Sequence, residues 1–541
     1  ANLSYINKSE KYNVCFYPDK AKFSRNDDNI KTTMSVIIAP EEPVEIRRLE
    51  LKNIGNDDEI LEISSVIEPV ISGKSQEYAH KAFNNLFLSF ELEDGIIIAK
   101  RKARDEHDED LYLAISLFSD KSITGEMEFE LDRKNLCGRQ NFDIPELIKE
   151  SKPFSKTIEN TTNPIIAFRN SIELKSNEEC IMSLIIGVSE NKEDAVKNVK
   201  KYMNNENIER AFNLSKAQIE AKIQYLGIHG KDVNLYQRIL SQVLLKCENK
   251  LVKFNENKLY PTNELWKFGI SGDNPIILVK IKEISEIDIV ETVVKAYEFY
   301  KIQNINIDLI ILNEEKESYE NYIQEAINEV IWNHNLSNSN NGKVFVLNNL
   351  SNDDKEFLSF RADLILSGNY GNISNQLDEY NYEYSKALKN IKYQSRDNKS
   401  KNEKANISNY KMNLEELKFF NEYGGFSSDG KEYIINVNKS KKTPLVWSHI
   451  MANKTFGTVV TEAMGGYTWY KNSRLNRLTA WSNDPVLDTP SEVIYLQDKE
   501  KNINWSVTSS PMPDENEYYI KYGLGYAKYI HSSDDIYQEI D

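Results

Sequence analysis

The chain has 541 residues, of which 40% are hydrophobic, a length and composition that suit about three or four domains with ordinary cores. Its formal net charge is −17, so its surface repels phosphodiester backbones and anionic lipid headgroups, and we expect neither nucleic acid nor a membrane surface as a partner. The sequence has no long apolar run and no signal-peptide pattern at its start, which predicts a cytoplasmic protein without a membrane segment.

The cysteines and histidines are scattered rather than grouped. No C-x-x-C pair or H-E-x-x-H spacing occurs, and the dispersed thiols indicate a reduced compartment. We therefore expect no disulfide framework, no metal and no cofactor. The dispersed residues are Cys15, Cys137, Cys180, Cys247, His80, His107, His229, His334, His449 and His531.

Residues 1–190 read as a β-sandwich. Apolar or alternating runs such as "TTMSVIIA", "VEIRRLELKN" and "CIMSLIIGVS" are typical of strands, and turn clusters such as "NIGNDDE" separate them. This first domain is therefore expected to be all β.

Residues 191–260 change to a helical period and are predicted to form a helical linker with one or two hairpins.

Residues 261–372 are predicted to form a small three-layer α/β domain. Short apolar runs such as "NPIILVKI" and "NIDLIILN" alternate there with helix-like segments, the pattern of a parallel sheet. The turn "GISGDNP" before the first run is a tight turn or a weak anion nest, and a small-molecule pocket at the carboxyl ends of the strands is a lesser hypothesis. The strongly polar residues 373–417 are expected to be a linker.

Residues 418–541 return to strands and form a second predicted β-sandwich segment. A shift of 506 positions aligns residues 12–30 with residues 518–536 without a gap, which indicates a duplicated sandwich. On this interpretation the chain is a fragment that begins within one sandwich and stops within another. Residues 418–541 could then complete a composite sandwich with residues 1–190, so that the two chain ends pack together.

Several long motifs resemble a known family. The runs "LWKFGISGDNPIILVKI", "YGGFSSDGKEYII" and "TPLVWSHIMANKTFGTVVTEAMGGYTWYKNSRLNRLTAWSNDP" look like the phosphorylase-like region of cyclic β-1,2-glucan synthases. That region is similar to the cellobiose-phosphorylase-like enzymes of glycoside hydrolase family 94, formerly glycosyltransferase family 36. The resemblance covers nearly the whole chain.

The resemblance implies a mainly β fold with an α/β part, in which large antiparallel supersandwich segments of the galactose-mutarotase type lie at both ends. It also implies a catalytic (α/α)₆ barrel, in which an Asp acts as general acid while phosphate attacks the anomeric carbon with inversion. No run of a dozen helices occurs in these 541 residues. The expected partners are therefore a β-glucan or oligosaccharide and the missing barrel, and the catalytic residues are unknown.

The segment "MGGYTWYKNSRLNRLTAWSNDP", residues 464–485, is the candidate sugar site. Sugars are held by rings that stack on their C–H faces and by planar polar groups that bind hydroxyls in pairs. The other interpretation is a sandwich corner, with the rings in the core and the arginines in internal salt bridges. The candidate substrate-binding residues are Trp469, Tyr470, Arg474, Arg477, Trp481, Asn483 and Asp484, beside Tyr467.

Two functions follow from these patterns. The first is a carbohydrate-binding and scaffolding segment of a glycoside phosphorylase or cyclic β-1,2-glucan synthase-type protein. The alternative is a self-contained sugar-active enzyme, mutarotase-like or lyase-like, on the sandwich itself. That alternative requires a general base beside an acid in the cleft, and His449 is the histidine nearest to the aromatic segment in sequence.

Overall fold

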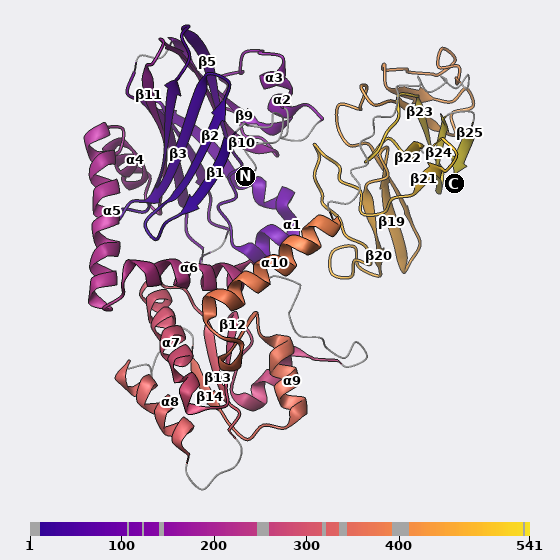
Figure 1. Cartoon of the computed structure of the whole chain (residues 1–541). Coiled ribbons are helices and arrows are strands. Elements are labelled where there is room, and N and C mark those ends of the chain that lie inside the picture. Colours follow the sequence, from indigo (N-terminus) through magenta and orange to yellow (C-terminus); the bar gives the residue numbers. More distant parts are fainter. Residues whose placement is uncertain are drawn as a thin grey trace. The chain divides into compact units, whose positions relative to one another are not determined.

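A computed structural model describes residues 11–104, 106, 108–121, 124–139, 145–245, 259–315, 321–334, 343–391, 411–501, 503–533 and 536–541. Antiparallel sheets occupy the first and last parts of the chain, and helices with a parallel sheet occupy the middle (Figure 1). This arrangement confirms the predicted fold class. The chain divides into two compact units: unit 1 combines Ala1–Phe212 with Asn402–Asp541, and unit 2 is Asn213–Lys401.

The first segment of unit 1 contains an eight-stranded and a three-stranded antiparallel sheet. The eight strands follow the order β1-β2-β3-β4-β11-β8-β7-β6, and the three follow β5-β10-β9. Their bounds are β1 Lys11–Phe16, β2 Ala21–Asp27, β3 Ile30–Ile38, β4 Val44–Asn53, β5 Glu59–Ile67, β6 Leu88–Glu93, β7 Ile96–Arg101, β8 Leu111–Ser119, β9 Thr124–Asp132, β10 Pro164–Leu174 and β11 Glu179–Ser189.

The eight-stranded sheet is covered on both faces. Ile97 shares a core with Phe168 of the three-stranded sheet, whereas Ile98 shares a core with Val199 of helix α4, Lys192–Lys201. Successive residues of a strand point to opposite faces, so a strand that is covered on both sides needs an unbroken apolar run. This explains why the run "IIIA" at the start of β7 does not alternate with polar residues.

The remaining helices of this segment lie in its connections. They are α1 Lys74–Asn85, α2 Arg133–Cys137, α3 Glu146–Lys149 and the start of α5 Asn205–Tyr225. Helix α1 is interrupted at His80, whose backbone is extended, with φ −166° and ψ 81°. The sequence predicts no element at α1, because this helix lies in a half-exposed connection without a clear apolar pattern.

The second segment of unit 1 contains three further antiparallel sheets. Their orders are β16-β17-β23-β24-β25, β18-β19-β20 and β21-β22. The bounds are β16 Gly424–Phe426, β17 Tyr433–Val437, β18 Ser448–Ala452, β19 Phe456–Thr461, β20 Gly466–Tyr470, β21 Tyr495–Asp498, β22 Ile503–Ser506, β23 Tyr518–Gly523, β24 Tyr526–Ser533 and β25 Ile536–Ile540. One core joins the five-stranded sheet to side chains such as Met451 and Val460 of the three-stranded sheet.

The two aligned segments of the sequence have the same strand register. Tyr12 pairs with Arg25 across β1 and β2, and the positions 506 residues later, Tyr518 and His531, pair across β23 and β24. The third strands also correspond, because each pairs with its second strand at equivalent residues. Among the described strands, the first, β1, and the last, β25, belong to different sheets.

Unit 2 is built on a parallel sheet with the order β14-β13-β12-β15. The strands are β12 Ile276–Ile281, β13 Asp308–Asn313, β14 Val344–Leu347 and β15 Leu364–Ser367. The helices are α6 Gly230–Leu244, α7 Ile287–Ile302, α8 Tyr322–Asn333, α9 Asn352–Arg361 and α10 Ile373–Ile391, with 3-10 turns at Thr262–Phe268, Ile284–Glu286 and Gly368–Tyr370.

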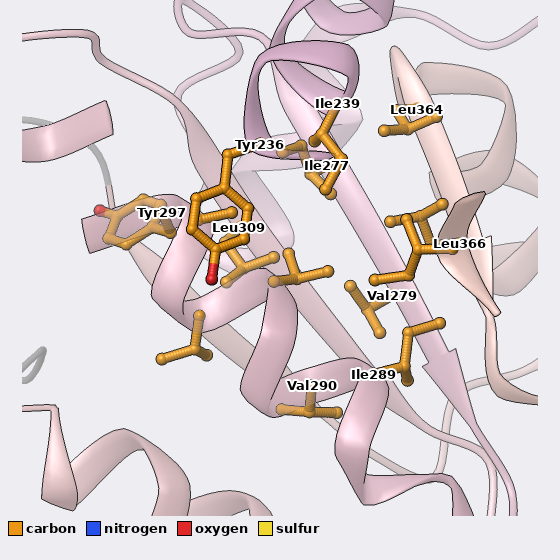
Figure 2. Close-up of a cluster of buried hydrophobic side chains, with 14 of the residues drawn as sticks. Tyr236, Ile239, Ile277, Val279, Ile289, Val290, Tyr297, Leu309, Leu364 and Leu366 are labelled. Atoms are coloured by element: carbon orange, nitrogen blue, oxygen red, sulfur yellow. The ribbon is translucent and has the colours of Figure 1, made fainter. Parts of the chain in front are cut away.

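Two cores cover the two faces of this sheet. Figure 2 shows Ile277 and Val279 of β12 on the side of α7, where Val290 lies. The alternate residues, Ile276 and Leu278, belong to the core on the other face. The sheet is therefore the middle layer of the three-layer α/β domain that the alternating apolar runs predict.

Two stretches differ from the expected linkers. Residues 373–391 form α10, which packs Leu377 into the core of unit 2, although the surrounding sequence is polar. Helix α6, expected in a linker, packs Tyr236 and Ile239 into the same core. A few buried side chains on one face are enough to fix a helix, and such a narrow stripe is hard to see in a polar segment. The rest of the expected polar linker, residues 392–410, lies outside the described residues.

Candidate functional site

The aromatic segment begins in β20, the third strand of the β18-β19-β20 sheet. Tyr467 lies opposite Val459, and Trp469 lies opposite Gly457. Since alternate residues of a strand share a face, Tyr467 and Trp469 point to the same side. A Cβ at Gly457 would lie 2.3 Å from Cζ2 of Trp469, so glycine is what allows the indole to lie against β19.

A glycine corner leads the chain into β20. Gly466 has a φ of +101°, in the region that favours glycine, and a Cβ there would lie 2.2 Å from the carbonyl oxygen of Val459. A Cβ at Gly465 would lie 2.2 Å from Oδ1 of Asp488. The corner therefore requires both glycines, and it fixes where the first ring of the segment emerges.

The loop after β20 folds back along the strand. The side chain of Asn472 accepts hydrogen bonds from the backbone N–H groups of Arg474 and Leu475, each at 2.9 Å. This is the local turn chemistry for which Asn is favoured. The backbone of Arg477 then forms an isolated antiparallel β-bridge with that of Trp469. The loop therefore returns the guanidinium to the face of the sheet that carries the rings.

Three rings and one guanidinium meet in what we call the aromatic cluster, made of Tyr467, Trp469, Arg477 and Trp481. The rings of Tyr467 and Trp481 are stacked, with centroids 4.6 Å apart and planes 23° apart, and Trp469 lies 5.3 Å from Tyr467. The Arg477 guanidinium lies 5.4 Å from the Tyr467 centroid and 5.5 Å from that of Trp481. Within the described part of the chain, Nε of Arg477 is buried without a hydrogen-bond partner.

Helix α1 of the first segment borders this cluster. The imidazole of His80 lies 6.2 Å from the Trp481 ring at 76°, an edge-to-face arrangement. Nη2 of Arg477 donates to the carbonyl oxygen of Ala79 at 3.5 Å. The interruption of α1 at His80 places these two groups at the cluster, and 398 residues separate Ala79 from Arg477 in sequence.

A buried ion pair anchors the end of the aromatic segment. The carboxylate of Asp484 pairs with the guanidinium of Arg133, which also lies 3.4 Å from Glu68. Asp484 also accepts hydrogen bonds from the backbone N–H groups of Val486 and Leu487, at 2.9 and 3.0 Å. Burial would raise the pKa of this carboxyl, but the backbone donors and Arg133 outweigh it and hold the pKa below its ordinary value.

A second ion pair lies beside it. Arg139 donates to the Glu462 carboxylate at 3.1 Å, to the carbonyl of Val486 at 3.0 Å and to Thr443 at 3.3 Å. Glu462 is 3% exposed, so its negative charge is stabilised by these donors rather than by water. Near this pair, burial raises the pKa of Asp488 to about 6.

The structure brings some candidate residues together and separates others. Trp469, Arg477 and Trp481 meet in the aromatic cluster with Tyr467. The other four candidates lie outside it: Tyr470 and Arg474 are exposed, Asn483 has a left-handed backbone conformation with φ +48°, and Asp484 is held by Arg133.

Sequence reasoning missed His80 and the two anchoring arginines, Arg133 and Arg139. All three are distant in sequence from the residues that they contact: His80 is 401 positions from Trp481, Arg133 is 351 from Asp484, and Arg139 is 323 from Glu462. No local pattern marks them, since each stands in an ordinary connection of the first segment.

The aromatic cluster combines ring faces with a planar cation, and it contains no carboxylate that could exchange a proton. Among the described residues, no group of three or more His, Cys, Asp and Glu side chains could hold a metal ion. None of the helices in the described part of the chain is long and apolar enough to cross a membrane.

The sequence of this chain matches one family profile and several curated proteins. The family profile "Glycosyl hydrolase 94, supersandwich domain" matches residues 3–205 and 431–541, more than half of the chain. The "Cyclic beta-(1,2)-glucan synthase NdvB" of Rhizobium meliloti (strain 1021) is 23% identical over 97% of this chain and 19% of its own length. The "N,N'-diacetylchitobiose phosphorylase" of Vibrio proteolyticus is 32% identical over 20% of this chain and 13% of its own length.

The chain therefore spans about a fifth or less of the length of these curated relatives. Among solved structures, a putative kojibiose phosphorylase from the human microbiome aligns with 36% of this chain and 23% of its own, at 7% identity and a TM-score of 0.24. A bacterial glucoamylase complexed with acarbose aligns with 42% of this chain and 31% of its own, at 13% identity and a TM-score of 0.27.

Proposed function

This chain belongs to the glycosyl hydrolase 94 supersandwich family, and on that basis we propose that it binds a β-linked glucan at the aromatic cluster. In this proposal it is a carbohydrate-binding and scaffolding segment of a glycoside phosphorylase or cyclic β-1,2-glucan synthase-type protein. The observation that carries the proposal is the stack of Tyr467 and Trp481 with the Arg477 guanidinium over both rings.

The chemistry of the cluster supports a sugar as its ligand. Pyranose rings present C–H groups that pack on aromatic faces, and a guanidinium can bind two neighbouring hydroxyl groups at once. Trp481 and Trp469 are half-buried, so part of each indole remains accessible while the rest is fixed by packing. Nε of Arg477 is a buried donor that has no protein partner within the described residues, and a ligand hydroxyl would satisfy it.

The scaffolding part of the proposal rests on the apolar surface near the cluster. Ile450 of β18 is 64% exposed on the same face as Tyr467, and Leu475 of the loop is 80% exposed. Exposed apolar side chains that gather beside a polar site are typical of an interaction surface. We propose that this surface packs against the helical barrel of the proteins that the chain resembles.

The carboxylates near the cluster favour binding over catalysis. A self-contained enzyme requires an acid and a base that reach the substrate. Asp484 is occupied by Arg133, and Asp488 is buried with its carboxylate hydrogen-bonded by Thr461 at 2.5 Å. Neither side chain is placed to protonate a sugar that lies on the rings.

Calorimetric titration with β-1,2-linked gluco-oligosaccharides tests the proposal. Trp481→Ala should weaken binding about tenfold or more, or about 1.4 kcal/mol, because a stacking face is lost. Trp332→Ala is the matched control, since Trp332 is 79% exposed on α8 of unit 2 and should not affect the dissociation constant. Equal affinity of wild type and Trp481→Ala, or no heat at millimolar sugar, would refute the proposal.

A further inference from the structure

A cavity of about 750 Å³ lies in the last segment of unit 1. We call it the aromatic pocket. The aromatic side chains that line it come from β16, β17, β23, β18 and the residue before β18, and they are Phe426, Tyr433, Tyr522, His449 and Trp447. This volume lies within the range of about 300–1,000 Å³ that small-molecule sites occupy.

The rings of this pocket support one another. Phe426 meets Tyr433 edge to face at 5.0 Å, and Tyr433 meets Trp447 in the same way at 5.9 Å. The hydroxyl of Tyr522 donates to the backbone carbonyl of Trp447 at 2.8 Å. The apolar walls are thus held in place without a ligand, which lowers the entropy cost of binding one.

His449 is the polar group that the pocket leaves unsatisfied. Its imidazole stacks on the Tyr522 ring, with centroids 5.0 Å apart and planes 12° apart. Its Nε2 is buried and has no hydrogen-bond partner among the described residues. A buried polar atom without a partner is unfavourable, and a ligand hydroxyl group at this nitrogen would supply the missing hydrogen bond.

The charged groups around the pocket are already paired. The Glu432 carboxylate lies 3.1 Å from Nζ of Lys521 and accepts a hydrogen bond from the Tyr526 hydroxyl at 2.6 Å. Lys431, at the rim, lies 3.7 Å from Asp429. The pocket therefore offers ring faces and one imidazole nitrogen rather than a free charge, and it suits a neutral ligand with an apolar face and hydroxyl groups.

The aromatic pocket is separate from the aromatic cluster. His449 lies opposite Val460, and Val460 lies opposite Gly466, whereas Tyr467 is the next residue of β20. Directly opposed residues share a face of a sheet and adjacent residues do not, so His449 and Tyr467 lie on opposite faces of the three-stranded sheet. A change at one site can therefore be made without altering the other.

We propose that the aromatic pocket is a second carbohydrate site, which takes one glucosyl unit on its rings with a hydroxyl group hydrogen-bonded to Nε2 of His449. The assignment of a sugar rests on the proposed function, whereas the pocket itself rests on its own rings and imidazole. A chain with two such sites would hold one glucan at two points.

The test measures binding of a β-1,2-linked glucose disaccharide by calorimetry in a Trp481→Ala background, where the aromatic cluster is disabled. One saturable site should remain, and adding His449→Phe should weaken it at least tenfold. Phenylalanine keeps the stack on Tyr522 and removes only the ring nitrogens. Phe426→Ala, at a half-exposed wall, should have the same effect and replaces His449→Phe if that variant fails to fold.

The outcomes separate the two proposals. If Trp481→Ala alone abolishes binding, the pocket proposal is overturned and the cluster proposal stands. If Trp481→Ala has no effect and His449→Phe abolishes binding, the pocket stands and the cluster proposal fails. An unchanged dissociation constant for both pocket variants also overturns the pocket, and a wild-type chain that binds no sugar overturns both.

Discussion

Arg139→Met tests whether buried ion pairs hold the aromatic segment against the first segment of unit 1. The change removes the cation beside Glu462, which is 3% exposed, together with donors to Val486 and Thr443. Removing one partner of a buried pair costs about 3–5 kcal/mol. We expect about 3 kcal/mol, the low end of that range, because Glu462 keeps hydrogen bonds from Thr443 Oγ1 at 2.6 Å and the Trp447 N–H at 2.9 Å.

The free energy of unfolding would be measured in urea by tryptophan fluorescence. A background in which Trp266 and Trp332 of unit 2 are Phe leaves the four remaining tryptophans, all in residues 411–541, as reporters. Adding Glu462→Gln to Arg139→Met should restore part of the loss, about 0.5–3 kcal/mol, because the uncompensated charge is removed. Lys439→Met, which breaks an exposed pair with Glu515, is the control and should cost less than about 1 kcal/mol.

The reasoning would be refuted if Arg139→Met cost no more than the Lys439→Met control. It would also be refuted if the double variant were as destabilised as the sum of its two single changes. Either result would mean that the Arg139–Glu462 pair contributes no more than an ordinary surface contact.

Two further predictions concern the same region. Burial raises the pKa of Asp488 from its ordinary 3.8 to about 6, which means that the folded state favours the protonated carboxyl. The stability that this carboxyl contributes is full below pH 3.8 and is lost as pH rises through 6. Asp488→Asn should therefore gain stability relative to wild type between pH 4 and pH 7, by roughly 3 kcal/mol in urea titrations, and a constant difference would contradict this. Gly457→Ala should displace the Trp469 ring and weaken glucan binding severalfold in calorimetry, whereas Gly73→Ala, which has open space, should not.

Much of the fold can be read from the sequence because burial on both faces leaves a clear signal. The apolar run "IILV" at the start of β12 is an example, because Ile276 to Val279 are all buried, and the run "IIIA" of β7 is buried in the same way. Strands β1 and β2 were not identified directly, since their residues are exposed or half-buried and their sequences are polar. Their place became visible only through the shift of 506 positions.

The candidate site was predictable only in its local part. Residues of β20 and its loop meet because they are close in sequence, and Trp469 and Arg477 form a bridge across eight positions. The contacts of His80 with Trp481 and of Arg133 with Asp484 depend on how distant segments pack. The sequence predicts Asp484 as a sugar ligand because its distant partner cannot be seen locally, whereas in the structure its carboxylate pairs with Arg133.

The most direct test of glucan binding at the aromatic cluster uses the chain labelled with 5-fluorotryptophan. Its six tryptophans give six fluorine resonances, which single Trp→Phe variants assign. Titration with a β-1,2-linked gluco-oligosaccharide should shift the resonances of Trp481 and Trp469 saturably and leave that of exposed Trp332 unchanged. Shifts that spare Trp481 and Trp469, or no shift at millimolar sugar, would contradict the account.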